Sequence, residues 1–158
     1  MTERSNPVSI SAENFLHHVP LMAGLDDEAL HFLSSMAVEI HYPVGSVIIR
    51  EGEPGNSMLF LATGRVKVLK GYVVGQSVTL AEFGPGEFFG EMSMVDCTAH
   101  SASVLAVDEV IIYSLKGADF HRLYHHRPDQ YGIVILNLAR DLARRLRALD
   151  ERLWLLSH

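Results

Sequence analysis

Cysteine is nearly absent from this chain of 158 residues, in which Cys97 is the only one. A single cysteine excludes an internal disulfide and any metal or iron–sulfur site that needs several thiolates. Long apolar runs are also missing, so the sequence offers no candidate for a membrane-spanning helix. The first 15 residues lack the basic and then apolar pattern of a signal peptide. We therefore expect a cytoplasmic protein with no membrane contact.

Positive charge is in short supply as well. Lys and Arg number 13 against 19 Asp and Glu, which gives a net charge of -6 and argues against bulk binding to nucleic acid or an anionic membrane. The sequence contains no P-loop, nucleophile elbow or pair of catalytic acids, so we expect neither an enzyme nor a bound cofactor. Its length and its 48% hydrophobic content suit one globular domain over residues 1–158.

Two periodicities divide the chain. Residues 11–36 have helical spacing, with Asp26 as the predicted N-cap of a second helix. From residue 37 to about 116, short alternating runs are separated by turns rich in Gly and Pro, which indicates a β-sandwich or barrel. Residues 117–158 return to helical spacing, and Pro128 suits the first turn of a last helix that ends near Leu156.

The predicted last helix carries a leucine repeat. Its members, spaced alternately four and three residues apart, are Ile135, Ala139, Leu142, Leu146, Leu149, Leu153 and Leu156. This is the a/d pattern of a coiled coil over three heptads, so residues 135–156 predict a homodimer in which Arg145 pairs with Asp150 of the partner chain. The alternative is a helix that packs on its own strands.

The segment 84–106 concentrates the residues that are suited to ligand binding. It reads GPGEFFGEMSMVDCTAHSASVLA, with a Gly-Pro-Gly turn before the aromatic pair Phe88 and Phe89. The apolar turn that follows Gly90 and Glu91 predicts a short helix, whose free amides would attract an anion. Gly90 allows a ligand to approach the backbone closely, and the carboxylate of Glu91 is suited to accept a hydroxyl.

This segment resembles the phosphate-binding cassette of the cyclic nucleotide-binding domain family, to which kinase regulatory subunits and bacterial catabolite-activator-type regulators belong. Phe89-Gly90-Glu91 and Ser101-Ala102 match the family pattern, and the turns at Gly45, at residues 51–56 and at Gly64 extend the resemblance over nearly the whole chain. The resemblance implies a mainly β fold: a jelly-roll barrel (double-stranded β-helix) over residues 37–116, with N-terminal helices and a long C-terminal helix. It also implies a sensor that binds cyclic AMP or cyclic GMP and repositions its C-terminal helix. The implied ligand-binding residues are Phe89, Gly90, Glu91, Met92, Ser93, His100, Ser101 and Ala102.

His100 departs from the pattern, because it stands where the family has its phosphate-binding Arg, and Ala99 stands where the family has Pro. A neutral histidine offers one donor, whereas arginine offers a permanently charged fork. We therefore expect weak cyclic nucleotide binding, with Glu91 accepting a ribose hydroxyl. The alternative is a degenerate, ligand-free domain that acts as a dimeric protein-interaction scaffold.

Three remaining features bear on partners and metals. The bacterial regulators of the family continue into a helix-turn-helix, whereas this chain stops at His158, so we expect no DNA-reading unit and either a natural single-domain protein or a fragment. His121 and His125 have metal-compatible spacing, but no nearby Glu or Cys completes a ligand set, so we expect no metal site. No cation adjoins Cys97 in sequence to lower its thiol pKa, which favours an inert thiol.

Overall fold

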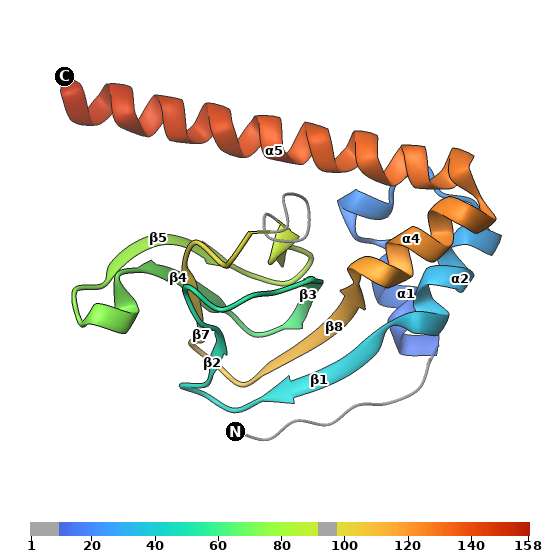
Figure 1. The fold of residues 1–158 in the computed structure, drawn as a ribbon, viewed down its shortest axis with the longest axis horizontal. Helices are drawn as coiled ribbons and strands as arrows, with labels where there is room; N and C mark the ends of the chain where they lie inside the picture. Colours follow the sequence, from blue (N-terminus) through green and yellow to red (C-terminus); the bar gives the residue numbers. More distant parts are fainter. Residues whose placement is uncertain (1–9, 92–97) are drawn as a thin grey trace.

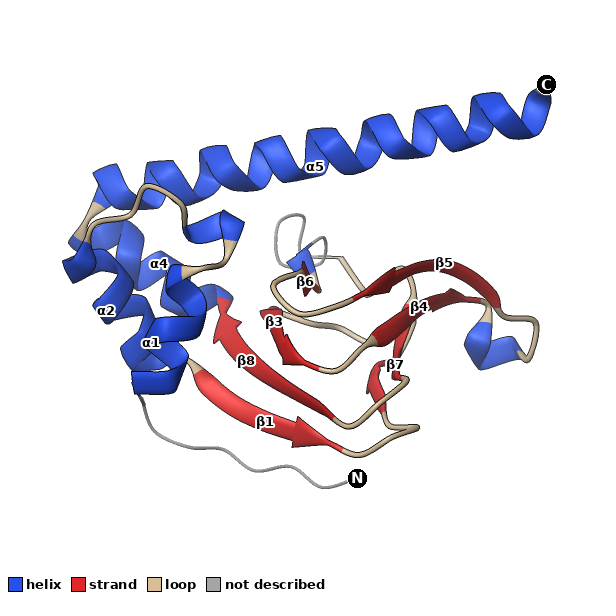
Figure 2. Cartoon of the chain, turned by 180° about the vertical axis from the view of Figure 1, so that it is seen from behind, coloured by secondary structure: helices blue, strands red, loops and turns tan. Residues whose placement is uncertain are grey.

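The computed structural model describes residues 10–91 and 98–158, whose strands form two four-stranded antiparallel sheets (Figures 1 and 2). The first sheet has the order β1-β8-β3-β6 and the second the order β2-β7-β4-β5. The strands are β1 (Val38–Tyr42), β2 (Val47–Ile49), β3 (Ser57–Thr63), β4 (Val66–Lys70), β5 (Val78–Phe83), β6 (Phe88–Phe89), β7 (Ser103–Ala106) and β8 (Val110–Lys116). The predicted jelly-roll fold with flanking helices is confirmed, except that strand pairing leaves two separate sheets rather than a closed barrel.

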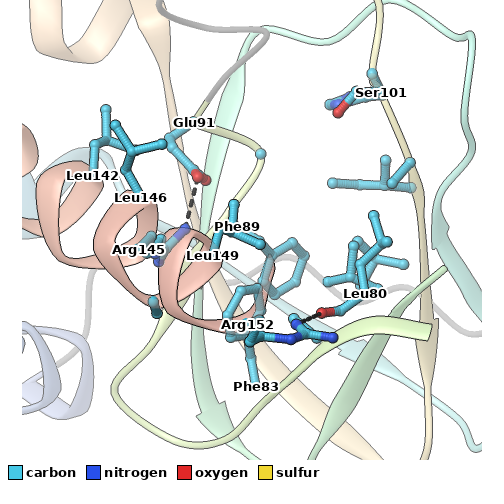
Figure 3. A pocket seen from close by; sticks show the side chains of 18 of the residues that line it. Leu80, Phe83, Phe89, Glu91, Ser101, Leu142, Arg145, Leu146, Leu149 and Arg152 are labelled. Atoms are coloured by element: carbon cyan, nitrogen blue, oxygen red, sulfur yellow. Dashed lines mark hydrogen bonds and ion pairs between the residues drawn. The ribbon is translucent and has the colours of Figure 1, made fainter. Parts of the chain in front are cut away.

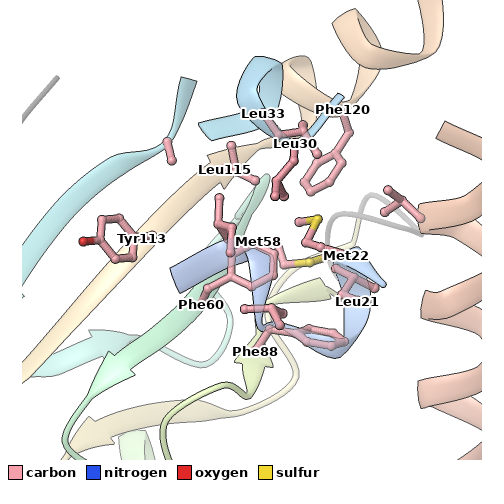
Figure 4. Close-up of a cluster of buried hydrophobic side chains, with 14 of the residues drawn as sticks. Leu21, Met22, Leu30, Leu33, Met58, Phe60, Phe88, Tyr113, Leu115 and Phe120 are labelled. Atoms are coloured by element: carbon pink, nitrogen blue, oxygen red, sulfur yellow. The ribbon is translucent and has the colours of Figure 1, made fainter. Parts of the chain in front are cut away.

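Strand β3 of the first sheet is buried on both faces, which explains its continuous apolar run. Side chains of one strand alternate between faces, so Leu59 and Leu61 face the second sheet while Met58 and Phe60 face the helices. β8 repeats this division, with Ile112 in the core between the sheets. The core on the helical side is shown in Figure 4.

Helices precede the first strand and follow the last one. The N-terminal ones are α1 (Ile10–His17), the 3₁₀ turn η1 (Pro20–Met22) and α2 (Asp27–Met36), and the C-terminal ones are α4 (Gly117–His126) and α5 (Pro128–Ser157). A second 3₁₀ turn, η2 (Tyr72–Val74), forms the tip between β4 and β5. The predicted N-cap is confirmed, because a carboxylate oxygen of Asp26 accepts the amide of Ala29 at 2.9 Å. No helix within the described ranges combines the length and the apolar content needed to cross a bilayer.

The two halves of α5 have different surroundings. The first half packs against the N-terminal helices through Val134 and Leu138, which are 1% and 5% exposed. Asn137 fixes this half further, since its amide nitrogen donates to the carbonyls of Leu21 at 2.9 Å and Ala23 at 2.8 Å. The second half runs on past the cassette segment toward β5 (Figures 1 and 2). The helix is therefore anchored firmly at one end only.

Candidate functional site

A cavity of about 600 Å³ separates the second half of α5 from the strands. Its walls come from β2, β4, β5, β6 and β7, from residues 90–91 and 100–102, and from α5. The residues that line it are Ile49, Val68, Leu80, Ala81, Phe83, Phe89, Gly90, Glu91, His100, Ser101, Ala102, Val104, Leu142, Arg145, Leu146, Ala148, Leu149, Arg152, Leu153 and Leu156. Most of these side chains are apolar, as is usual for a pocket that binds a small organic molecule.

Six of the eight predicted ligand-binding residues line this cavity. They are Phe89, Gly90, Glu91, His100, Ser101 and Ala102. The other two, Met92 and Ser93, lie outside the described residues, as do the predicted helical turn 92–95 and Cys97. The structure thus brings together two stretches, 89–91 and 100–102, that sequence reasoning had grouped into one site.

Strand β6 determines where Glu91 lies. Phe88 and Phe89 pair with Phe60 and Leu59 of β3, so Phe88 enters the helical core and Phe89 the core between the sheets. Gly90 follows with a φ of +87°, and a Cβ at this position would lie 2.8 Å from the carbonyl oxygen of Ser57. Only glycine suits this conformation and this approach. The backbone therefore requires glycine at position 90 whether or not a ligand binds there.

Glu91 is buried and forms an ion pair with α5. Its side chain is 7% exposed, and one oxygen accepts from Nη1 of Arg145 at 2.7 Å (Figure 3). Burial raises the pKa of Glu91 above its usual value, and the charge of Arg145 counteracts part of that rise. A charged carboxylate in such surroundings depends on its cation.

Arg145 is held by several groups at once. Its Nη2 donates to the carbonyl of Phe88 at 3.0 Å, and its Nε lies 2.8 Å from a carboxylate oxygen of Asp141. The guanidinium carbon also lies 5.1 Å from the ring centre of Phe83 and 4.6 Å from that of Phe88, within the range of cation–π attraction. Arg145 therefore links α5 to both ends of the β5–β6 connection.

His100 is packed into the turn of residues 51–56. Its backbone nitrogen donates to the carbonyl of Glu53 at 2.9 Å, and its own carbonyl accepts the amide of Gly52 at 2.9 Å. The imidazole lies directly on Gly55, where an added Cβ would be 2.0 Å from Nε2. Burial lowers the pKa of His100 below its ordinary value, while nearby Glu53 opposes that shift. The ring is therefore neutral at pH 7 in the free protein.

The leucine repeat of α5 faces the cavity of its own chain. Leu142, Leu146, Leu149, Leu153 and Leu156 all line it, and the last four remain 60%, 51%, 63% and 84% exposed. Within its own chain Arg145 bonds to Glu91 and Asp141. The predicted pairing of Arg145 with a partner's Asp150 would have to compete with these contacts, and it stays a prediction.

Sequence reasoning missed the part of the cavity that α5 and β5 contribute. Leu80 and Phe83 of β5 line it, and Nη1 of Arg152 donates to the carbonyl of Leu80 at 3.1 Å (Figure 3). The heptad spacing predicts an apolar face on this helix, but it does not predict which residues that face contacts.

The two histidines weighed as metal ligands lie on the exposed side of α4. Their Nε2 atoms are 3.0 Å apart. Among the residues that the structure describes, no cluster of three or more potential metal ligands occurs.

Comparisons with known proteins agree with this geometry. Residues 39–127 match the family model described as the cyclic nucleotide-binding domain. The chain is 39% identical over 138 residues to the cyclic AMP receptor protein of Thermus thermophilus, which covers 87% of this chain and 62% of that protein. The chain thus spans less than two thirds of the length of that relative.

Two solved structures are similar to this one. A cyclic nucleotide-binding domain from Methylobacillus flagellatus superposes with a TM-score of 0.84 at 24% identity, over 96% of this chain and 87% of that one. The regulatory subunit of a cAMP-independent protein kinase A from Trypanosoma brucei superposes with a TM-score of 0.72 at 27% identity, over 83% of this chain and 44% of that one.

The ion pair between Arg145 and Glu91 yields a stability prediction. Replacing Arg145→Met leaves the buried carboxylate of Glu91 without its cation, while Asp141 keeps its contact with Arg144. We expect a loss of about 2–3 kcal/mol in the free energy of unfolding at pH 7. This is below the ~3–5 kcal/mol of a fully buried pair, because 28% of the Arg145 side chain is exposed. Protonation of Glu91 relieves the penalty, so the loss shrinks as the pH falls toward 4.5, the ordinary pKa of a glutamate. Urea unfolding measures both effects.

Arg144 provides the matched control. It pairs with the same Asp141 at 3.2 Å, but its side chain is 66% exposed, so Arg144→Met should change the unfolding free energy by less than about 0.5 kcal/mol. Equal losses for the two variants would show that the contact with Glu91 contributes nothing to stability.

Proposed function

Because the chain belongs to the cyclic nucleotide-binding domain family, we propose that it is a regulatory sensor domain in which a ligand docks on the cassette, residues 84–106, and repositions α5. The observation that carries this proposal is the ion pair between Glu91 of the cassette and Arg145 of α5, inside a cavity that both elements line. A group that competes for Glu91 acts directly on the helix.

The competition works through hydrogen-bond acceptors. A ligand hydroxyl that donates to Oε1 of Glu91 competes with Nη1 of Arg145, which donates to the same oxygen. Arg145 retains Asp141 on its own helix, so it can leave Glu91 without losing every charged partner. The two helix positions then differ by a modest free energy, and a ligand shifts the balance by its differential affinity for them.

In this proposal the ligand of the domain is cyclic AMP or cyclic GMP, bound weakly. Glu91 accepts the ribose hydroxyl, and His100 occupies the position of the arginine that binds phosphate in the family pattern. One similar structure is the regulatory subunit of a protein kinase A that is named as cAMP-independent. Membership of the family therefore does not by itself identify the ligand. Losing the cationic partner of a buried charge costs on the order of 2–5 kcal/mol, which is the reason for the weak binding.

The affinity for cyclic nucleotides should depend on pH through His100. Burial holds the pKa of His100 below its ordinary value of 6.5 in the free protein, and a phosphate beside it would raise that pKa. Binding then takes up a proton, so the dissociation constant for cyclic AMP falls as the pH is lowered from 8 to 6, by up to about tenfold per unit between the two pKa values. Calorimetric titration at several pH values measures this slope.

Two substitutions at the same position separate the contributions. His100→Arg supplies a permanent charge and should tighten cyclic AMP binding by at least about tenfold, with no pH slope, while His100→Gln should lose the slope without the gain. If folded His100→Arg still binds neither cyclic AMP nor cyclic GMP at millimolar concentration, the sensor proposal fails for these ligands and the scaffold alternative is favoured.

We also propose that the domain forms a homodimer through residues 135–156. Four of the leucines of α5 that line the cavity, Leu146, Leu149, Leu153 and Leu156, stay more than half exposed. A continuous apolar stripe of this kind is rarely left uncovered in a monomer. A second copy of α5 would cover the open side of this stripe, while the ion pair of Arg145 remains within its own chain.

Introducing negative charge into the leucine stripe of α5 tests the dimer proposal. Leu146→Glu combined with Leu149→Glu places like charges along the helix pair and should yield monomers in sedimentation at high micromolar concentration. Leu136→Glu combined with Leu155→Glu is the control, because these leucines are 51% and 59% exposed but lie outside the repeat, so this variant should stay dimeric. A monomeric wild type, or a dimeric Leu146/Leu149 variant, contradicts the assignment.

A further inference from the structure

Apart from His100, the only ionisable charges of the cassette that are present at neutral pH are negative. Residues 84–106 contain Glu87, Glu91 and Asp96 and neither lysine nor arginine. The phosphate of a cyclic nucleotide carries a full negative charge, and removing that charge from water is costly unless cationic donors replace the hydration shell. Any such cation must therefore come from outside this segment.

The nearby cations outside the segment already have carboxylate partners. Lys70 lies 3.0 Å from an oxygen of Glu51, and its ammonium donates to the carbonyl of Ser101 at 2.6 Å. Arg50 faces Glu53 at 3.7 Å. Arg145 is shared between Glu91 and Asp141, as described above. These charges neutralise one another, so the described side chains at this end of the cavity offer a phosphate no excess positive charge.

The remaining charged group of the lining, Arg152, belongs to a different part of the cavity. It lies beside Leu80 and Phe83 of β5, away from Ser101 (Figure 3). In the free protein at pH 7.5 the ring of His100 adds no positive charge, because it packs against Gly55 and burial lowers its pKa. A ligand with its hydroxyls at Glu91 therefore meets a neutral wall where the family pattern has a charged one.

We propose that the ligand preferred by this site is uncharged: a ribonucleoside, bound more tightly than its own 3′,5′-cyclic phosphate. This inference rests on the proposed sensor function and specifies its ligand class. The ribose 2′-hydroxyl donates to the Glu91 carboxylate, a charge-assisted bond that needs no phosphate. The planar base lies on the apolar lining supplied by α5 and β5, which removes apolar surface of both from water.

Calorimetric titration of the full chain at pH 7.5 tests the preference. Adenosine, guanosine and their 3′,5′-cyclic monophosphates are compared pairwise, with the matching 2′-deoxynucleosides as ligand controls. We expect at least one nucleoside to bind tenfold or more tightly than its cyclic phosphate, and its 2′-deoxy form to bind at least tenfold more weakly. His100→Arg should reverse the order by favouring the cyclic phosphate.

The outcomes distinguish the preference for an uncharged ligand from the proposed sensor function. If wild-type protein binds a cyclic phosphate as tightly as its nucleoside, or more tightly, the preference for an uncharged ligand is overturned while the sensor function stands. If none of these compounds binds, both the preference and the proposed function are contradicted. Equal binding of a nucleoside and its 2′-deoxy form overturns the assignment of the hydroxyl to Glu91.

Discussion

The burial of one carboxylate, Glu91, is the constraint on which the arrangement of α5 depends. A buried carboxylate needs a cation, and Arg145 reaches it from the middle of a helix whose other polar ties lie elsewhere. The first half of α5 is fixed by Val134, Leu138 and Asn137. The second half covers an open cavity, contacts the cassette through Arg145 and contacts β5 through Arg152. The buried ion pair of Arg145 is the stronger of these two ties, so it largely sets how closely the helix approaches the sheets.

The same contact explains how a small ligand could have a large effect. Glu91 serves two purposes, since it neutralises Arg145 and is also the acidic acceptor in the cavity where a hydroxyl would bind. Arg145 in turn has a second carboxylate, Asp141, and two aromatic rings, so its release from Glu91 is not prohibitively costly. A helix anchored at one end amplifies a small displacement near its middle into a larger one at its exposed end.

Much of the fold follows from the sequence, while the site follows only in part. The short apolar runs between turns rich in Gly and Pro, the cap at Asp26 and the placement of Pro128 predict the strands and helices because they are local effects. Glu91 and His100 were predicted by a resemblance whose pattern is also local. The contacts of Arg145 with Glu91 and Asp141 were not predicted, since a heptad repeat marks an apolar face but does not say whether that face meets a second helix or the same chain. The packing of His100 on Gly55 joins residues 45 positions apart, which no periodicity reveals.

The central claim is that a ligand at Glu91 moves α5, and a distance between spin labels tests it most directly. Glu82 on β5 and Arg147 on α5, both exposed, are each replaced by cysteine in a Cys97→Ser variant and spin-labelled. The labelled protein is diluted with unlabelled protein, so that only distances within one chain are measured. The account predicts that saturating adenosine, or saturating cyclic AMP with His100→Arg, shifts the distance distribution, and that Glu91→Gln abolishes the shift. An unchanged distribution in the presence of bound ligand would contradict it.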